Sequence, residues 1–136
     1  MILSDRDILR MLKNGDLKIE PFSEENLTPN GYDLSIGEIY IRKVDKRVNE
    51  GKVKIPPLTW FAISTKEFIG LGSRITAQLW IRSSYARRGI FASFGKVDAG
   101  FRGNLTIGCF NADREVELSL IHISEPTRPR LISYAV

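Results

Sequence analysis

The sequence predicts a mainly β domain, a β-sandwich or jelly-roll-like barrel with one short N-terminal helix. Beyond Gly15, short segments rich in β-branched and aromatic residues alternate with glycine, proline and asparagine, as is typical of an all-β domain. The 136 residues, 43% apolar and 26% charged, have the composition of an ordinary globular chain. Their number suits one domain with a single modest core, because two domains would each have too little surface to bury.

The helix is expected over residues 4–14. Ser4 can cap its first turn, and Gly15 can end it. Apolar residues recur on one face at the 3.6-residue period: Ile8, Leu9 and Leu12.

The remaining elements are expected to be strands. Pro56 and Pro57 lack a backbone N–H and therefore mark a junction or an edge between strands. A single helical turn is predicted over residues 83–87, which have neither clean alternation nor strong turn residues. Three glycines are expected at turns or bulges: Gly70, Gly72 and Gly100. The predicted strands cover residues 18–20, 32–36, 39–44, 53–55, 60–65, 75–81, 88–93 and 104–110.

The net charge of +4 suits an anionic ligand without requiring nucleic acid. The one dense basic stretch, residues 42–54, is interrupted by Asp45 and Glu50 and is interpreted as a solvated hairpin edge. A nucleic-acid-binding barrel would alternate exposed aromatic and basic residues on one sheet face, and the sequence has no such stripe. We therefore expect no nucleic-acid partner.

The single cysteine, Cys109, excludes an internal disulfide and suits a reducing cytoplasm. The apolar start, residues 1–3, is too short for a signal peptide, and no run of about 18 apolar residues predicts a membrane span. The expected location is therefore the cytoplasm, with no membrane partner.

Three polar segments are candidates for chemistry: residues 29–34, 82–89 and 97–111. In the second, Ser83 and Ser84 can donate hydroxyl hydrogen bonds to phosphate oxygens, and Arg82 supplies a fixed fork of charged donors. The segment is therefore a candidate oligophosphate cradle. The alternative is a serine-capped polar turn with its arginines in solvent.

In the third segment, Asp98 lies between Val97 and a glycine-containing turn beside Phe101. Its carboxylate could orient a water molecule or accept a sugar hydroxyl, while the aromatic ring packs on deoxyribose. The alternative is an Asx-type turn with Phe101 in the core. No His/Cys cluster predicts a protein-held metal, and neither a Walker loop nor a serine–histidine pair is present.

In order and spacing, these segments resemble the conserved motifs of the superfamily that joins dCTP deaminases to trimeric dUTPases. Residues 30–34 resemble the first shared motif. Arg82, Ser83 and Ser84, with Ala86 and Arg87, resemble the second, which binds the triphosphate. Residues 97–103 resemble the third, which forms the deoxynucleoside pocket, and residues 1–9 and 19–22 resemble the deaminase-type branch. The resemblance implies a dUTPase-like β-barrel.

The resemblance also implies a homotrimer with active sites between subunits, a substrate that is dUTP or dCTP, and Mg²⁺ bound through the triphosphate. Asp98 would activate water in a dUTPase or lie at the sugar in a deaminase, and Arg87 would lie near the water and the base. Phe101 would pack on deoxyribose and leave no room for a 2′-hydroxyl. Catalytic roles are expected for Asp98, Ser83 and Arg87. Substrate binding is expected from Arg82, Ser83, Ser84, Arg87, Asp98, Phe101 and Gly103.

One departure from the family pattern concerns the reaction. Deaminases carry a catalytic glutamate at a fixed distance after the third motif, and here that position is Gly108. Glycine cannot move a proton, and general acid–base help is typically worth about 100- to 10,000-fold. Trimeric dUTPases also lack a carboxylate there. Gly108 therefore favours a dUTP diphosphatase, which makes dUMP and pyrophosphate, over a dCTP deaminase. An inactive nucleotide-binding paralogue is the third hypothesis.

A second departure is the C-terminus. Full-length members continue with further strands and a glycine-rich arm that closes over the phosphates. Here residues 118–128 resemble a translated sequencing adapter, and residues 132–136 resemble the flow-cell end of the same oligonucleotide. We therefore expect an incomplete dUTPase-like domain over residues 1–117 and a non-native tail over residues 118–136, poorly packed from about Ser124 and far less active than a complete homologue. His122, the sole histidine, lies in this tail and is given no catalytic role.

Overall fold

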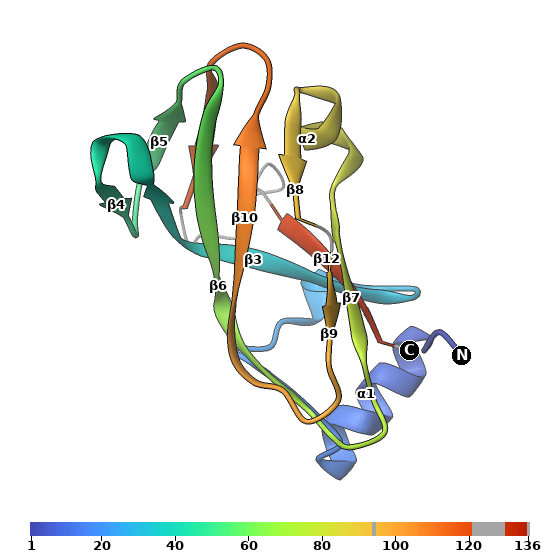
Figure 1. Cartoon of the computed structure of the whole chain (residues 1–136). Coiled ribbons are helices and arrows are strands. Elements are labelled where there is room, and N and C mark those ends of the chain that lie inside the picture. The colour runs from blue at the N-terminus through green and yellow to red at the C-terminus, as the bar shows by residue number, and fades with distance from the viewer. Residues whose placement is uncertain (94, 121–129, 136) are drawn as a thin grey trace.

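A computed structural model describes residues 1–93 and 95–120 and the backbone of residues 130–135 (Figure 1). The described strands form one large curled sheet in the order β8-β10-β6-β3-β12-β7-β9, with β1 beside β6 and β2 and β4 beside β3. A smaller sheet pairs β11 with β5. The predicted mainly β fold with an N-terminal helix is confirmed. The elements are α1 (Asp5–Asn14), β1 (Leu17–Glu20), η1 (Glu24–Asn26), β2 (Leu27–Thr28), β3 (Gly31–Ile41), η2 (Arg42–Val44), β4 (Lys46–Val48), β5 (Lys52–Ile55), β6 (Thr59–Leu71), β7 (Ala77–Ile81), α2 (Ser83–Arg87), β8 (Ile90–Ala92), β9 (Lys96–Val97), β10 (Arg102–Asn111), β11 (Val116–Ser119) and β12 (Arg130–Ala135).

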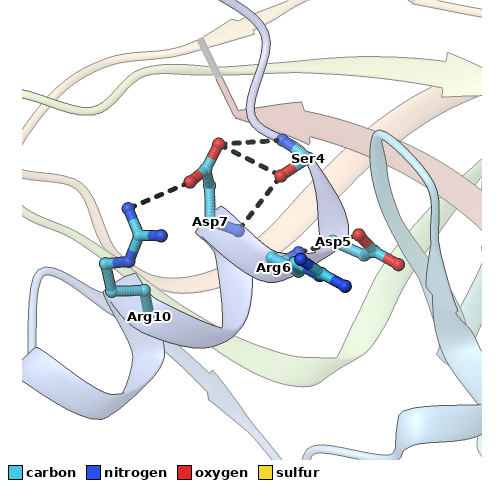
Figure 2. A network of polar contacts seen from close by, with 5 residues as sticks. All are labelled: Ser4, Asp5, Arg6, Asp7 and Arg10. Carbon is cyan, nitrogen blue, oxygen red and sulfur yellow. Dashed lines mark hydrogen bonds and ion pairs between the residues drawn. The ribbon is translucent and has the colours of Figure 1, made fainter.

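Helix α1 begins and ends where the sequence predicts. The hydroxyl of Ser4 accepts a hydrogen bond from the amide of Asp7 at 3.2 Å, and the carboxylate of Asp7 accepts one from the amide of Ser4 at 3.5 Å. This reciprocal pair is a capping box, and Arg10 extends it with an ion pair to Asp7 at 3.2 Å (Figure 2). Gly15 ends the helix with a φ of 86°.

The predicted apolar face of α1 is only partly right. Ile8 is buried, and Leu12 is partly buried against the core. Leu9, however, is exposed, and Met11 packs on the core instead. The helix therefore packs on the core through residues 8, 11 and 12. This face is rotated from the predicted one, because three apolar residues in a short helix do not fix its orientation.

The two predicted strands at residues 32–36 and 39–44 are wrong in their boundaries. They form one strand, β3, which passes through a bulge at Gly37 between its pairings with Thr65 and Ser64 of β6. A Cβ at Gly37 would lie 2.9 Å from the backbone of Lys66, so only glycine permits this close crossing. After Ile41 the chain enters the 3₁₀ turn η2 instead of continuing as a strand.

Other boundaries also differ from the sequence prediction. Gly70 lies inside β6, because that strand runs on to Leu71, whereas Gly72 and Gly100 lie at turns as expected. The very short strands β4 and β9 were not predicted. The basic stretch forms the exposed β3–β4 hairpin and the outward face of β5, as the solvated-edge interpretation predicted, and Arg47 pairs there with Glu38 at 2.8 Å.

A cluster of hydrogen bonds joins the three central strands β3, β6 and β10. Residues Thr65 to Glu67 of β6 bulge opposite the single residue Leu105 of β10. The side-chain amide of Asn104 donates to the carbonyl oxygens of Thr65 at 3.0 Å and of Glu67 at 3.1 Å. Across β6, the carboxylate of Glu67, only 2% exposed, accepts the backbone amide of Ser35 in β3 at 2.8 Å. One segment of β6 therefore fixes the positions of both neighbouring strands.

The C-terminal strands lie beside the predicted domain boundary. Strand β11 pairs with β5, and its Leu118 is buried, as is Leu120 beyond it. Strand β12 pairs with both β3 and β7. Residues 121–129, which include His122 and Ser124, lie outside the described residues, as does Val136. The division into residues 1–117 and a non-native tail stays a prediction. None of the described helices has the length and apolar character needed to cross a membrane.

The buried Glu67 predicts a specific pH dependence of stability. Burial raises the pKa of Glu67 above its ordinary value of 4.5, against the opposing effect of the Ser35 amide. The folded state therefore binds this proton more tightly than the unfolded state. The stabilising contribution is complete below the unfolded pKa and is lost as pH rises through the folded pKa.

The substitution Glu67→Gln keeps an acceptor for the Ser35 amide and removes the titration. The free energy of unfolding of this variant, relative to the wild type, should therefore rise as pH rises from the ordinary pKa of 4.5 through the raised pKa of folded Glu67, and then level off. Urea denaturation at several pH values measures the difference, with the substitution Glu25→Gln at an exposed position as the control. A difference that does not change with pH would show that Glu67 does not titrate on folding in this range.

Candidate nucleotide site

The second motif lies on the short helix α2 and its N-cap. Arg82 has an extended backbone, and its carbonyl accepts hydrogen bonds from the amides of Tyr85 at 3.0 Å and Ala86 at 3.2 Å. The predicted helical turn is therefore confirmed. Gly89 ends this segment with a φ of 90°, where a Cβ would collide with the side chain of Asp113. The serine hydroxyls and the basic side chains of this turn lie at the surface: Ser83, Ser84, Arg87 and Arg88.

An ion pair that the sequence reasoning missed joins the first motif to the second. The guanidinium of Arg82 lies 3.3 Å from a carboxylate oxygen of Asp33 in β3. The Asp33 side chain is 9% exposed and that of Arg82 is 42% exposed, so the carboxylate is anchored in the domain and the arginine reaches outward from it. The buried carboxylate therefore gives the guanidinium a positioned partner of opposite charge. The position of Asp33 in the first motif was the only sequence signal.

The third motif forms a tight turn between β9 and β10. The amide of Phe101 donates to the carbonyl of Asp98 at 3.1 Å, and Gly100 adopts a φ of 86°. The carbonyl of Phe101 accepts the amide of Leu71 at 2.8 Å, which fastens the turn to the end of β6. The Asp98 side chain is exposed. Its carboxylate makes no hydrogen bond or ion pair to any described side chain and so remains available for a ligand or water.

Phe101 makes the core contact that one of the two sequence interpretations predicted, and its packing on deoxyribose stays a prediction. The side chain is partly buried and packs against the hydrophobic core, and its ring passes 3.6 Å from the place of a Cβ on Gly103. Gly103 itself has a φ of 148° and is partly exposed. One face of the ring is therefore supported by the domain, while the turn that carries it lies at the surface.

The second and third motifs lie at opposite ends of one strand. Val97, next to Asp98, pairs with Ala77 at the start of β7, whereas Ser83 follows the end of that strand. Six residues of extended chain separate Ala77 from Ser83, a distance of about 20 Å at 3.3 Å per residue. Figure 1 shows α2 and the β9–β10 turn at opposite ends of β7. One chain therefore brings Arg82 to Asp33 but does not bring Asp98 to the serines.

Gly108 lies on the outward face of β10, opposite Ala62 of β6. A Cβ at this position would lie 3.3 Å from the indole nitrogen of Trp60 and 3.6 Å from its Cζ2. Any side chain longer than glycine at position 108 would therefore contact the indole of Trp60. No sequence signal singled out this tryptophan, because Trp60 and Gly108 lie far apart in the chain and meet only where β6 pairs with β10.

The other candidate groups for chemistry are unsuitable. Burial raises the pKa of the Cys109 thiol to about 12, so this cysteine is not a nucleophile near neutral pH. Over the part of the chain that the structure describes, no three His, Cys, Asp or Glu side chains are grouped to hold a metal ion. A metal held by the protein alone therefore does not fit these residues.

The sequence model of dCTP deaminase-like proteins matches residues 2–120, which is most of the chain. This chain belongs to the dCTP deaminase-like family. The dCTP deaminase of Pyrococcus furiosus is 41% identical over 125 residues, which cover 83% of this chain and 80% of that protein. A probable deoxyuridine 5′-triphosphate nucleotidohydrolase of Sulfolobus islandicus rod-shaped virus 1 is 39% identical over 121 residues, covering 87% of this chain and 76% of the viral protein.

Solved structures show the same fold for this dCTP deaminase-like protein. The 2′-deoxycytidine 5′-triphosphate deaminase of Agrobacterium tumefaciens superposes with a TM-score of 0.76 at 19% identity over 99% of this chain. The chain spans 48% of the length of that deaminase. The native EIAV dUTPase superposes with a TM-score of 0.62 at 16% identity, covering 88% of this chain and 85% of the dUTPase. The predicted dUTPase-like fold is therefore confirmed.

The Asp33–Arg82 pair predicts how the phosphate half of the site responds to mutation. Arg82→Ala should weaken binding of a deoxynucleoside triphosphate by roughly 1.5–3 kcal/mol, the usual range for hydrogen bonds to charged groups. Binding of the matching nucleoside should change little. Titration calorimetry measures both, with Arg88→Ala as the control because Arg88 stacks over Tyr85 at 5.4 Å. Equal losses for the nucleoside and the triphosphate would mean that Arg82 supports the fold instead of the phosphates.

Proposed function

We propose that this member of a deoxypyrimidine triphosphate enzyme family is a dUTP diphosphatase, which converts dUTP and water to dUMP and pyrophosphate. The observation that carries the proposal is Gly108, which stands where deaminases of the superfamily place their catalytic glutamate. The exposed Asp98 carboxylate remains as the candidate base for activating water. The names of the relatives favour the second candidate, a dCTP deaminase, since most of them carry that name and the viral relative carries the other.

In the proposed reaction, Asp98 at one end of β7 activates water, and the residues at the other end bind the phosphates. The Asp98 carboxylate takes a proton from water as the water oxygen bonds to the α-phosphorus. The bond to the oxygen that bridges to the β-phosphorus breaks, and pyrophosphate leaves with the electron pair. Arg82 and the hydroxyls of Ser83 and Ser84 stabilise the charge that grows on the phosphate oxygens.

Three further groups complete the proposed site. Arg87, exposed at the end of α2, adds positive charge beside the triphosphate. The ring of Phe101, with Gly103 behind it, supplies the surface on which deoxyribose packs. Magnesium is proposed to enter bound to the triphosphate, because the described residues offer no cluster of ligands to hold it.

The separation of the motifs supports a site shared between copies of the chain. About 20 Å of strand separates Ala77, which pairs with Val97 beside Asp98, from Ser83, so one chain holds the two motifs apart. Two copies can combine the Asp98 turn of one with the α2 turn of the other. We therefore propose a homo-oligomer, in the family a trimer, as the active form, with the site incomplete in one chain.

Mixing two inactive variants tests the shared site. Asp98→Asn should lose most turnover because an amide is a poor base, and Arg82→Ala should lose triphosphate binding. Co-expression of the two variants should restore activity, since about a quarter of the sites in randomly mixed assemblies would combine two intact halves. Pyrophosphate release from dUTP by the copurified mixture measures it. A mixture as inactive as its components would contradict the shared site.

The reaction itself is tested by its products. The protein should release pyrophosphate from dUTP and negligible ammonia from dCTP, because no carboxylate occupies position 108. The assay should use this chain and, in parallel, a chimera that carries the C-terminal residues of the Pyrococcus furiosus relative. Asp98→Asn supplies the background rate. Robust ammonia release from dCTP would establish the deaminase alternative and mean that another carboxylate acts as the base.

A further inference from the structure

A row of three aromatic residues crosses the outward face of the large sheet. Phe110 of β10 pairs with Trp60 of β6 on one side and with Phe91 of β8 on the other. Residues that pair directly across antiparallel strands project from the same face of a sheet, so the three side chains are neighbours. We call Phe91, Phe110 and Trp60 the aromatic row. No single segment of the sequence contains it, because its members come from three strands.

The aromatic row is accessible to solvent in the single chain. Phe91 is 60% exposed and Phe110 is 38% exposed, whereas Cys109 and Asn111 on the opposite face of β10 are buried. Trp60 is partly buried, with the guanidinium of Arg42 over its ring at 3.9 Å. Large apolar side chains that lie together at a surface mark a place where another molecule binds.

The aromatic row borders the helical turn that carries the second motif. Strand β8 begins at Ile90, directly after the turn that follows Arg87 at the end of α2, and Figure 1 shows α2 next to β8. The carbonyl of Gly89 accepts the amide of Ala112 at 2.8 Å, which fastens this turn to the residue that follows β10. Both α2 and the row therefore belong to the same end of the sheet.

We propose that the aromatic row is the apolar centre of the surface on which a second copy of this chain docks. The inference rests on the proposed function, in which the Asp98 turn of one copy meets the α2 turn of another and the site is incomplete in one chain. A copy that reaches α2 lies beside Phe91 and Phe110, because β8 continues directly from that turn. Aromatic side chains are enriched at the centres of protein interfaces, where their burial supplies much of the binding free energy.

The charged groups beside the row favour a protein over single-stranded nucleic acid, which also stacks on aromatic rings. Tyr40 lies on the same outward face, and Arg47 stacks over its ring at 4.4 Å while it pairs with Glu38 at 2.8 Å. The Glu38 carboxylate would repel a phosphate backbone, and Arg42 is already stacked on Trp60. The cations of this face are thus engaged within the chain.

The double substitution Phe91→Ser and Phe110→Ser tests the surface by the mass of the protein in solution. In analytical ultracentrifugation the wild type should sediment as an assembly of several copies, and the double variant should sediment as a single chain. Its circular dichroism spectrum should stay that of the wild type, because both rings are exposed in the single chain. The control is Ile2→Ser, which removes an apolar side chain that is 57% exposed and lies outside the row. This control should keep the assembly. A wild type that sediments as one chain, or a folded double variant that still assembles, would overturn the inference.

A second measurement leaves the row intact and does not depend on the folding of the double variant. The chain has two tryptophans, so Trp80→Phe makes Trp60 the only source of indole fluorescence. Acrylamide should quench this fluorescence less efficiently in the assembly than after dilution to the single chain, because docking covers the row. Equal quenching of the two forms would show that Trp60 lies outside the interface.

Two further readouts separate this inference from its alternatives. A fluorescently labelled oligo-dT probe should not bind the wild type, and binding that the double substitution abolishes would assign the row to nucleic acid instead. Pyrophosphate release from dUTP distinguishes the inference from the proposed function. An assembly that depends on the row but leaves dUTP intact would contradict the proposed function alone. A double variant that still assembles and cleaves dUTP would overturn the inference alone.

Discussion

The hydrogen bond between the buried carboxylate of Glu67 and the backbone of Ser35 is the constraint on which the arrangement of the site depends. It lies in the bulged segment of β6, between the strand that carries Asp33 and the strand that leads out of the Asp98 turn. The desolvation of a buried carboxylate is unfavourable, so the group is tolerated only because the Ser35 amide and the surrounding contacts hold it. A residue outside every recognised motif therefore sets the spacing of two of them.

The two strands that flank β6 lead to motifs at opposite ends of β7. The β3 side delivers Asp33, which anchors Arg82 beside the serines of α2. The β10 side delivers the turn of Asp98 and Phe101 at the far end of β7. Strands are stiff and extended, so a distance set by strand length cannot be closed by side-chain motion. This stiffness is the reason for proposing a site shared between copies of the chain.

The residue at position 108 bears on which of the two reactions known in the family this chain carries out. The family membership establishes the fold and the kind of nucleotide, and the names of the relatives lean toward deamination. The proposed reaction rests instead on position 108, which has no side chain and lies beside the indole of Trp60. A glycine at this position cannot act as a general base.

The sequence by itself determined the features that depend on neighbouring residues. The capped helix α1, the helical turn after Arg82 and the glycine turn after Asp98 all formed as predicted, because caps and turns are satisfied within a few positions. The motifs likewise indicated the family through their residue types and their order along the chain, neither of which depends on how the strands pair. The division of the chain at residue 117 stays a prediction.

Only the tertiary structure decided which distant residues meet. It joined two predicted strands into β3 at Gly37, turned Leu9 of α1 outward, and paired Asp33 with Arg82. It also placed Trp60 against Gly108 and the Glu67 carboxylate on Ser35. These contacts link residues that lie far apart in the chain, and their register is set by bulges and by packing across the sheet. A local pattern carries no record of either, which is why these contacts became visible only in the fold.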